Sequence, residues 1–351
     1  MADIPIVDFA KAIDGTKDEK EAVAKAIDNA FQNMGFVYLK NHSVPLELVE
    51  ECFTWVRSPG PTLPTHTRSS PHTITQSKKF FALPHSTKIL APHPPGGSHH
   101  RGYSAPGVEK VSQHEYDANE LAKARDVPEF KESFESGNID DDTQPNIWLP
   151  DNEIPGFRAF MEKYFTHCAR LVHRILDSLS IALNVPSPGL TSTHSNNLFQ
   201  LRLLHYPAIA THELTNNKRS RINAHSDFGT LTLLFQDAIG GLEIEDPHQQ
   251  GIFRPAHPIT NTVLVNVGDL MERWSNDRWR STVHRVGSNT VTDDADGVVP
   301  DRYSIPFFAT PDMETVVEAL PGCWGEGRPK RYGAVTAWGY VQMRMAALYE
   351  G

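Results

Sequence analysis

The stretch that decides the fold is RINAHSDFGTLTLLF, residues 221–235, in which His225 and Asp227 stand two positions apart. On an extended chain, side chains two residues apart project from the same face. The run at 229–235 is apolar and contains β-branched residues, which is typical of a buried strand. The pattern predicts an imidazole and a carboxylate side by side at a strand end. The alternative is a turn in which Asp227 caps the backbone of the next two residues.

A second histidine lies in STVHRV, residues 281–286, where alternation places His284 on one face of a short strand. Two histidines and one carboxylate on one face of an iron ion leave the opposite positions open for a cosubstrate and dioxygen. A closed zinc site would use four protein ligands, usually with thiolates, and no cysteine stands near either stretch. We therefore predict that His225, Asp227 and His284 are metal ligands and catalytic residues. A hydrolytic or structural zinc site on the same residues is the alternative.

The third stretch is RYSIPFF, residues 302–308, where Arg302 and Ser304 share a strand face among apolar neighbours. A buried arginine is costly unless a carboxylate pairs with it. Its planar fork can bind a carboxylate through two hydrogen bonds, and the Ser304 hydroxyl adds a donor. The pair therefore suits the far end of 2-oxoglutarate. A surface arginine on an edge strand is the alternative.

The rest of the chain predicts helices first and strands afterwards. Apolar residues at helical spacing predict helices at 18–34, 45–56 and 153–184, with a strand at 35–42. Short alternating runs then predict strands at 198–206, 229–235, 242–245, 262–267, 281–286 and 302–308. The fold class is α+β, with an N-terminal helical and αβ region at 1–190 that packs on a β-sandwich or barrel at 191–351.

Residues 58–77 interrupt this pattern with prolines, serines and threonines. Such a composition cannot form a packed element and predicts a disordered loop. Removing it would join Trp55 to Lys78 in one continuous helix, so we interpret it as an insertion or a mispredicted exon boundary.

Charge and composition narrow the function classes. With 33 Lys+Arg against 43 Asp+Glu the net charge is −10, which disfavours nucleic acid as a partner. No apolar run is long enough for a membrane helix, and the N-terminus lacks a signal-peptide pattern. Three widely spaced cysteines match a reducing compartment, so we expect a cytoplasmic protein. The sequence leaves the oligomeric state open.

Together these motifs resemble the iron(II)- and 2-oxoglutarate-dependent dioxygenases, in the branch of isopenicillin N synthase and the plant flavonoid and hormone oxygenases. The openings IPIVDFA and GFVYLKNH are also similar to that branch. Stretches that resemble the fungal thymine 7-hydroxylase type are RGYSAPGVEKVSQ (101–113), FKESFESG (130–137), LRLLHYP (201–207) and WSND (274–277). The resemblance implies a double-stranded β-helix, or jelly roll, with flanking helices. It also implies Fe(II), 2-oxoglutarate and O2 as cofactors, with ascorbate as a supporting reductant.

The resemblance implies a role for Tyr206, which stands where many members carry a tyrosine beside the cosubstrate. Leu204 occupies the position of their asparagine. In pyrimidine hydroxylases of this type an asparagine stands where our alignment puts Phe199, which cannot pair with a ring amide. This change makes thymine a less favoured substrate.

The substrate pocket is expected to contain Phe199 and Phe308, with Gln200 or Arg202 fixing orientation. Arg101 and Tyr103 are expected in a lid over it. The favoured activity is hydroxylation of a small aromatic or polyketide-type metabolite in fungal secondary metabolism. The alternatives are a thymine or pyrimidine 7-hydroxylase, a non-catalytic 2-oxoglutarate-binding module, and nucleic-acid demethylation, which conflicts with the charge.

Overall fold

The structure is a computed structural model that describes residues 4–57, 80–95, 99–108, 127–186, 188–215, 219–287 and 297–349. The interpretation of 58–77 as an insertion, and of one helix from Trp55 to Lys78, falls outside these residues. Before residues 58–77, helix α3 (Leu46–Val56) ends, and after them a short 3-10 helix, η1 (Phe80–Ala82), begins.

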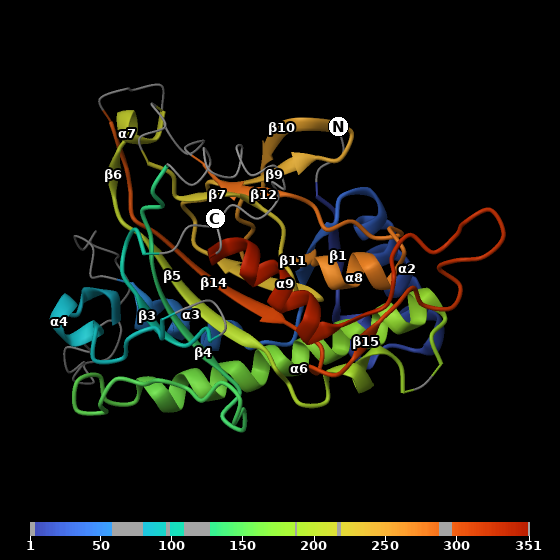
Figure 1. Cartoon of the computed structure of the whole chain (residues 1–351), viewed down its shortest axis with the longest axis horizontal. Helices are drawn as coiled ribbons and strands as arrows, with labels where there is room; N and C mark the ends of the chain where they lie inside the picture. The colour runs from blue at the N-terminus through green and yellow to red at the C-terminus, as the bar shows by residue number, and fades with distance from the viewer. Residues whose placement is uncertain are drawn as a thin grey trace.

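Two sheets form the centre of the molecule (Figure 1). In spatial order the larger sheet contains β1 (Ile6–Asp8), β2 (Phe36–Lys40), β11 (Thr262–Val267), β8 (Leu231–Gln236), β14 (Arg302–Ala309), β5 (Gln200–Tyr206), β4 (Glu132–Gly137) and β3 (Gly102–Ser104). The smaller contains β10 (Gln249–Pro255), β9 (Leu242–Asp246), β12 (His284–Val286) and β7 (Ile222–His225). Two-stranded pairs join β13 (Val298–Val299) to β6 (Ile209–Ala210) and β15 (Val316–Val317) to β16 (Val335–Thr336).

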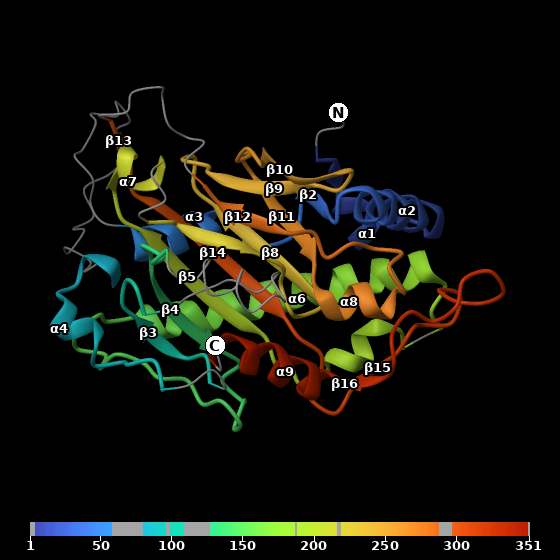
Figure 2. The ribbon, with the colours of Figure 1, turned by 45° about the horizontal axis from the view of Figure 1, so that its top comes forward.

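The larger sheet is buried on both faces, with the smaller sheet on one side and the long helix α6 (Phe157–Leu183) on the other (Figure 2). Strand β5 shows how alternation divides its residues between these two faces. Leu201 and Leu203 belong to the core cluster that includes α6, whereas Leu204 and Tyr206 belong to a smaller cluster between the two sheets. Every second residue of β5 therefore faces the space that holds the candidate site.

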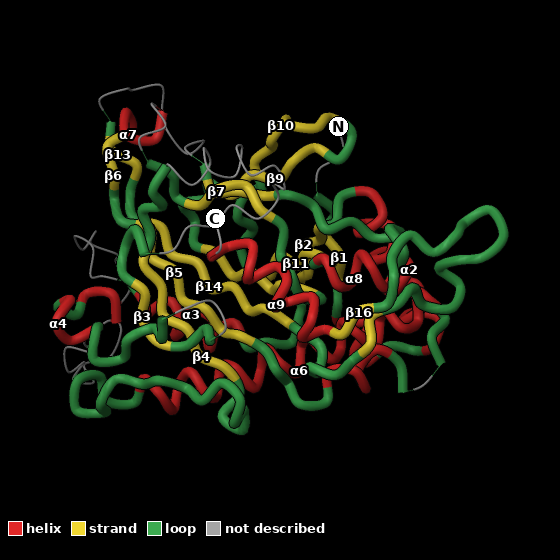
Figure 3. Tube along the Cα trace, in the orientation of Figure 1, coloured by secondary structure: helices red, strands yellow, loops and turns green. Residues whose placement is uncertain are grey.

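The helices lie around the strands (Figure 3). Helix α2 (Lys17–Asn33) begins at a capping box, in which the Thr16 hydroxyl accepts from the Glu19 amide and the Glu19 carboxylate accepts from the Thr16 amide. Helix α6 ends at Asn184, whose φ of 54° is left-handed. The remaining helices are α1 (Ala10–Asp14), α4 (His85–Lys88), η2 (Leu190–His194), α7 (Thr211–Thr215), α8 (Asp269–Trp274) and α9 (Ala337–Tyr349). Within the described residues, none of the helices could span a bilayer.

The predicted α+β class with a jelly-roll core is confirmed. The strand expected at 281–286 is shorter, because only residues from His284 onward pair with both neighbours. Strands β1 to β4 extend the larger sheet, and one core cluster runs from Val7 to Tyr340. The division at residue 190 therefore marks no break in the core of the described residues, and it stays a prediction.

Glu272 of α8 gives the fold a testable pH dependence. Burial, together with the carboxylates of Asp269 and Asp277, raises the pKa of Glu272 from 4.5 to about 7. The folded protein therefore keeps a proton that the unfolded chain releases at lower pH, so this residue costs stability as the pH rises from 4.5 to 7. Glu272→Gln should raise the free energy of unfolding above pH 7 by about 1–2 kcal/mol after solvent screening.

Urea unfolding at pH 5 and pH 8 measures this difference. The increase in the free energy of unfolding caused by Glu272→Gln should become smaller toward pH 4.5. The exposed control Glu326→Gln should change the free energy of unfolding at neither pH. A gain of equal size at both pH values would contradict the assignment.

Candidate metal and cosubstrate site

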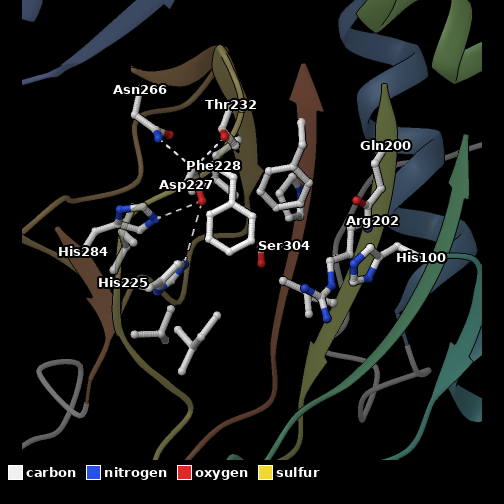
Figure 4. A pocket seen from close by; sticks show the side chains of 18 of the residues that line it. His100, Gln200, Arg202, His225, Asp227, Phe228, Thr232, Asn266, His284 and Ser304 are labelled. Carbon is white, nitrogen blue, oxygen red and sulfur yellow. Dashed lines mark hydrogen bonds and ion pairs between the residues drawn. The ribbon is translucent and has the colours of Figure 1, made fainter. Parts of the chain in front are cut away.

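Two adjacent strands bring the predicted metal ligands together. In the pairing of β7 with β12, His284 stands opposite His225, and their ring centroids lie 4.4 Å apart. Asp227 stands two residues after the end of β7, and its Oδ1 lies 3.9 Å from His225 Nε2 and 3.8 Å from His284 Nε2. Figure 4 shows the three side chains converging from the same wall of a cavity. All three side chains are almost entirely buried.

Hydrogen bonds to the far side of each of the three side chains leave one ligand atom of each free to bind a metal ion between them. The Nδ1 atoms of His225 and His284 donate to the carbonyls of Asn223 and Thr282, at 2.8 and 3.1 Å. A ring nitrogen that donates to a carbonyl leaves the lone pair on Nε2.

Asp227 is oriented in the same manner. Its Oδ2 accepts from the Thr232 hydroxyl at 2.5 Å and from the Asn266 side-chain amide at 2.8 Å. Oδ1 thus remains for a ligand, and one donor atom from each of the three residues lies within 4.8 Å of the others. Two imidazole nitrogens and one carboxylate oxygen on one side fit an iron(II) ion with open positions.

The electrostatics favour the metal-binding protonation states. Burial, with the adjacent His284, lowers the pKa of His225 to about 3. Burial alone would raise the pKa of Asp227, but the two histidines and the two hydrogen bonds hold it below its ordinary value. At neutral pH the site therefore offers neutral imidazole at His225 and an ionised carboxylate, which are the forms that coordinate metal.

Arg302 and Ser304 lie in the same cavity, which has a volume of about 390 Å³. Arg302 is only 1% exposed; its Nε donates to the Gly240 carbonyl at 2.6 Å and its Nη1 to the Ser304 hydroxyl at 3.1 Å. Its Cζ lies 4.9 Å from the ring centroid of Tyr206. Within the described part of the chain, no carboxylate forms an ion pair with Arg302, so this buried cation can accept an anionic ligand.

The other wall of the cavity is polar. Gln200, Arg202 and His100 line it, at a distance from the metal ligands (Figure 4). All three contact Glu135 of β4, which is fully buried: Arg202 Nε lies 3.0 Å from Oε1, and Oε2 accepts from Gln200 at 2.7 Å and lies 3.6 Å from His100 Nδ1. Phe308 also lines the cavity. Arg202 and Phe308, both expected in the substrate pocket, thus line the same cavity as the metal ligands.

The placement of Phe199 corrects the sequence prediction. Phe199 is 1% exposed and packs against His173, His194 and Phe307 in the core. Phe199 immediately precedes β5 and lies two residues before Leu201, so both side chains point to the face of the sheet that packs on α6. Arg202 is an odd number of residues away and points to the opposite face, toward the cavity. Phe199 therefore does not line the cavity, and the case against thymine that rested on its contact with substrate is lost.

Arg101 and Tyr103 do not line the cavity either. The Arg101 guanidinium forms a buried ion pair with Asp141, at 3.0 Å, and the Tyr103 hydroxyl donates to the Glu132 carboxylate at 2.6 Å. Both side chains are buried in the described structure, and the Arg101 guanidinium also donates to the carbonyls of Gln144 and His100, at 3.1 and 2.7 Å. The prediction that they form a lid in contact with substrate is therefore wrong.

Sequence reasoning missed the support from the C-terminal helix. Arg344 of α9 forms an ion pair with Asp269, donates to the Ser226 hydroxyl at 3.3 Å, and lies 4.6 Å from the Phe228 ring. The Asp269 amide in turn donates to the Asp227 carbonyl at 2.8 Å. The loop that carries Asp227 is thus held by Arg344, through the residues on either side of Asp227, and by the Asp269 amide, through the Asp227 carbonyl. No local motif signals this contact, because it joins residues far apart in the chain.

A jelly roll with two histidines, one carboxylate and a buried arginine–serine pair defines a non-haem iron oxygenase that uses a 2-oxo acid. Two family models match the chain. The 2OG-Fe(II) oxygenase superfamily matches residues 198–311, and the N-terminal region of non-haem dioxygenases in morphine synthesis matches 4–59 and 70–152. The chain belongs to the 2OG-Fe(II) oxygenase superfamily.

Relatives and solved structures agree over almost the whole chain. The 2-oxoglutarate-dependent dioxygenase frbA of Dothideomycetidae sp. (strain 11243) is 36% identical, covering 99% of this chain and 97% of its own. Proline hydroxylase buaE of Petromyces alliaceus is 35% identical, covering 98% of each. The structure of the Neurospora crassa thymine 7-hydroxylase with alpha-KG and thymine has a TM-score of 0.81 and 35% identity, covering 99% of this chain and 97% of that one.

These matches confirm the predicted class and its resemblance to the fungal thymine 7-hydroxylase type. The chain is an oxidoreductase of the 2-oxoglutarate-dependent dioxygenases, and its cofactors are Fe(II), 2-oxoglutarate and O2.

Proposed function

We propose that this dioxygenase hydroxylates a C–H bond of a small aromatic or polyketide-type metabolite of fungal secondary metabolism, whose polar end binds at Arg202. The supporting observation is that one cavity is lined by the metal ligands at one wall and, at the other, by Arg202, which pairs with the buried Glu135. Apolar side chains also line this cavity, including Phe228, Phe308 and Val341. A substrate that fills this space presents an apolar carbon to the metal while its polar group stays hydrogen-bonded.

In this proposal His225, Asp227 and His284 hold the iron. When bound, the metal supplies the activation of dioxygen, which is coupled to the oxidative decarboxylation of 2-oxoglutarate to succinate and carbon dioxide. Arg302 and Ser304 bind the distal carboxylate of 2-oxoglutarate, and the Tyr206 ring lies beside the guanidinium. These residues fix the cosubstrate so that its other end faces the metal ligands, and the apolar walls exclude water.

Arg202 is the residue whose replacement should separate substrate binding from cosubstrate binding. Its guanidinium lies on the polar wall, and Glu135 holds it there. Arg202→Gln should raise the KM for the substrate about tenfold or more and leave the KM for 2-oxoglutarate unchanged, because a hydrogen-bonded charge at one end is lost. Initial rates of succinate release, with each reactant varied in turn, measure this split.

The substrate is identified first, by measuring substrate-dependent succinate release with iron and ascorbate across aromatic metabolites, L-proline and thymine. Release with an aromatic metabolite supports the proposal. Arg202→Lys, which keeps the charge, is the matched control and should lose less than Arg202→Gln. Equal rises in both KM values would contradict a role for Arg202 at the substrate end.

A pyrimidine hydroxylase is the second candidate, since the similarity to the Neurospora crassa thymine 7-hydroxylase covers nearly the whole chain. Thymine-dependent succinate release at a high rate would replace our proposal with this one. A 2-oxoglutarate-binding module without turnover predicts binding but no oxygen consumption with any compound tested.

We further propose that the enzyme binds no nucleic acid and acts in the cytoplasm. The net charge of −10 supports the first statement. The three cysteines, which are buried and form no disulfide, support the second.

A further inference from the structure

Arg221 is a buried arginine that the roles above do not use. It stands just before β7, four residues ahead of His225, and is only 1% exposed. Its Nη2 donates to the Pro300 carbonyl at 2.5 Å, whereas its Nε and Nη1 are buried and have no hydrogen-bond partner in the described structure. A buried guanidinium with two unused donors is costly, so its presence calls for a function.

The position of Arg221 relates it to the cosubstrate end of the cavity. Its Cζ lies 5.9 Å from the Tyr206 ring centroid, and the Cζ of Arg302 lies 4.9 Å from the same centroid. Neither arginine forms an ion pair with a carboxylate of the described residues. Two buried positive charges therefore lie near one aromatic ring and repel each other.

The acidic residues nearby have other partners. Asp237 accepts from the amides of Ile239 and Tyr303, at 3.0 and 2.7 Å, and Asp301 accepts from His205 at 2.7 Å. Burial and the charge of Arg302 lower the pKa of Arg221 to about 10, so it is still a cation at neutral pH. The carboxylates of Asp237 and Asp301 attract Arg221 through space, but neither lies within ion-pair distance of Arg221 or Arg302 in the described structure, so both guanidinium groups can still gain an anionic partner.

Arg221 also connects the two strands that carry the site. It precedes β7, which ends at His225, and its hydrogen-bond acceptor Pro300 stands two residues before Arg302 at the start of β14. Loss of the side chain would remove a positive charge near the Tyr206 ring and the hydrogen bond to the segment that leads into β14.

We propose that Arg221 is a positioning residue for 2-oxoglutarate, acting as a second positive charge behind Tyr206 and as the tether that holds Arg302 toward the cavity. The inference rests on the proposed role of Arg302 at the distal carboxylate. It predicts that Arg221 contributes to the affinity for dicarboxylates, and not to metal affinity. The free energy lost to charge repulsion in the ligand-free protein is recovered when the carboxylate binds.

The experiment measures binding of 2-oxoglutarate to the whole protein by calorimetry without oxygen, with Mn²⁺ in place of iron. Arg221→Gln should weaken 2-oxoglutarate binding about tenfold, with Mn²⁺ affinity unchanged. Arg221→Lys keeps the charge and should lose less than about threefold. Pyruvate, which lacks the distal carboxylate, should bind wild type and Arg221→Gln equally, and the exposed control Arg158→Gln should bind 2-oxoglutarate like wild type.

A second measurement separates positioning from a role in folding alone. In a positioning role, the rise in melting temperature that 2-oxoglutarate causes becomes smaller in Arg221→Gln. A purely structural role lowers the melting temperature equally with and without the ligand, and this result would overturn the proposal.

Arg302→Gln distinguishes failure of this inference from failure of the cosubstrate site. Unchanged 2-oxoglutarate affinity in Arg221→Gln, with a large loss in Arg302→Gln, would overturn the role of Arg221 alone. Unchanged affinity in both would overturn the proposed site itself. If Arg221→Gln does not fold, Arg221→Lys carries the test, because a loss as large as that of Arg302→Gln would contradict the importance of the charge.

Discussion

Asp227→Ala is expected to lower succinate formation by at least about a thousandfold, and His225→Ala should abolish iron-dependent turnover as well. Asp227 supplies the single anionic donor of the metal site, and its other oxygen accepts from Thr232 and Asn266. Its loss therefore removes a ligand and leaves two buried donors without their acceptor. The measurements are succinate release with saturating iron and 2-oxoglutarate, and the iron content of the purified protein.

The matched control for this variant is Asp142→Ala, which removes an exposed carboxylate and should keep wild-type activity and iron content. The melting temperature shows whether Asp227→Ala is folded. Full succinate production by an iron-stripped Asp227→Ala protein would refute the metal site.

The second large effect is expected at Arg302. Arg302→Ala should raise the 2-oxoglutarate concentration needed for half-maximal rate about a hundredfold or more, with a smaller effect on the rate at saturation. The reason is that the guanidinium lies almost fully buried beside Ser304 and, among the described residues, has no carboxylate partner. Initial rates over a range of 2-oxoglutarate concentrations measure this effect.

Arg302→Lys is the informative control for this prediction. It keeps the positive charge but loses the planar fork, so it should fall between wild type and Arg302→Ala. An unchanged requirement for 2-oxoglutarate in Arg302→Ala would show that the cosubstrate binds elsewhere.

The parts of the site that the sequence predicts are those that depend on local geometry. The spacing of two residues predicts that His225 and Asp227 lie together at a strand end, and alternation along β14 predicts Arg302 beside Ser304, without knowledge of the partner strands. The long helix and the order of strands follow in the same way from periodic apolar residues. In these cases the residues close by in sequence determine which face of the helix or strand a side chain lies on.

The parts that the sequence does not predict depend on pairing between distant segments. Phe199 and Arg202 were both expected in the pocket, yet an odd separation along one extended segment sends them to opposite faces. Glu135 contacts Arg202 because β4 pairs with β5 in a register that sets these two residues opposite each other. Arg344 reaches the metal-ligand loop from the C-terminal helix, and a local pattern cannot encode that contact.

The most direct test of the central claim is an anaerobic titration of the whole protein with Fe(II), followed by 2-oxoglutarate, monitored by calorimetry and visible absorption. We expect one iron per chain, and then a charge-transfer absorption that saturates at one equivalent of 2-oxoglutarate. Asp227→Ala should show neither, and Arg302→Ala should bind iron but need far more 2-oxoglutarate. Iron binding and absorption in Asp227→Ala equal to those of the wild type would contradict the account.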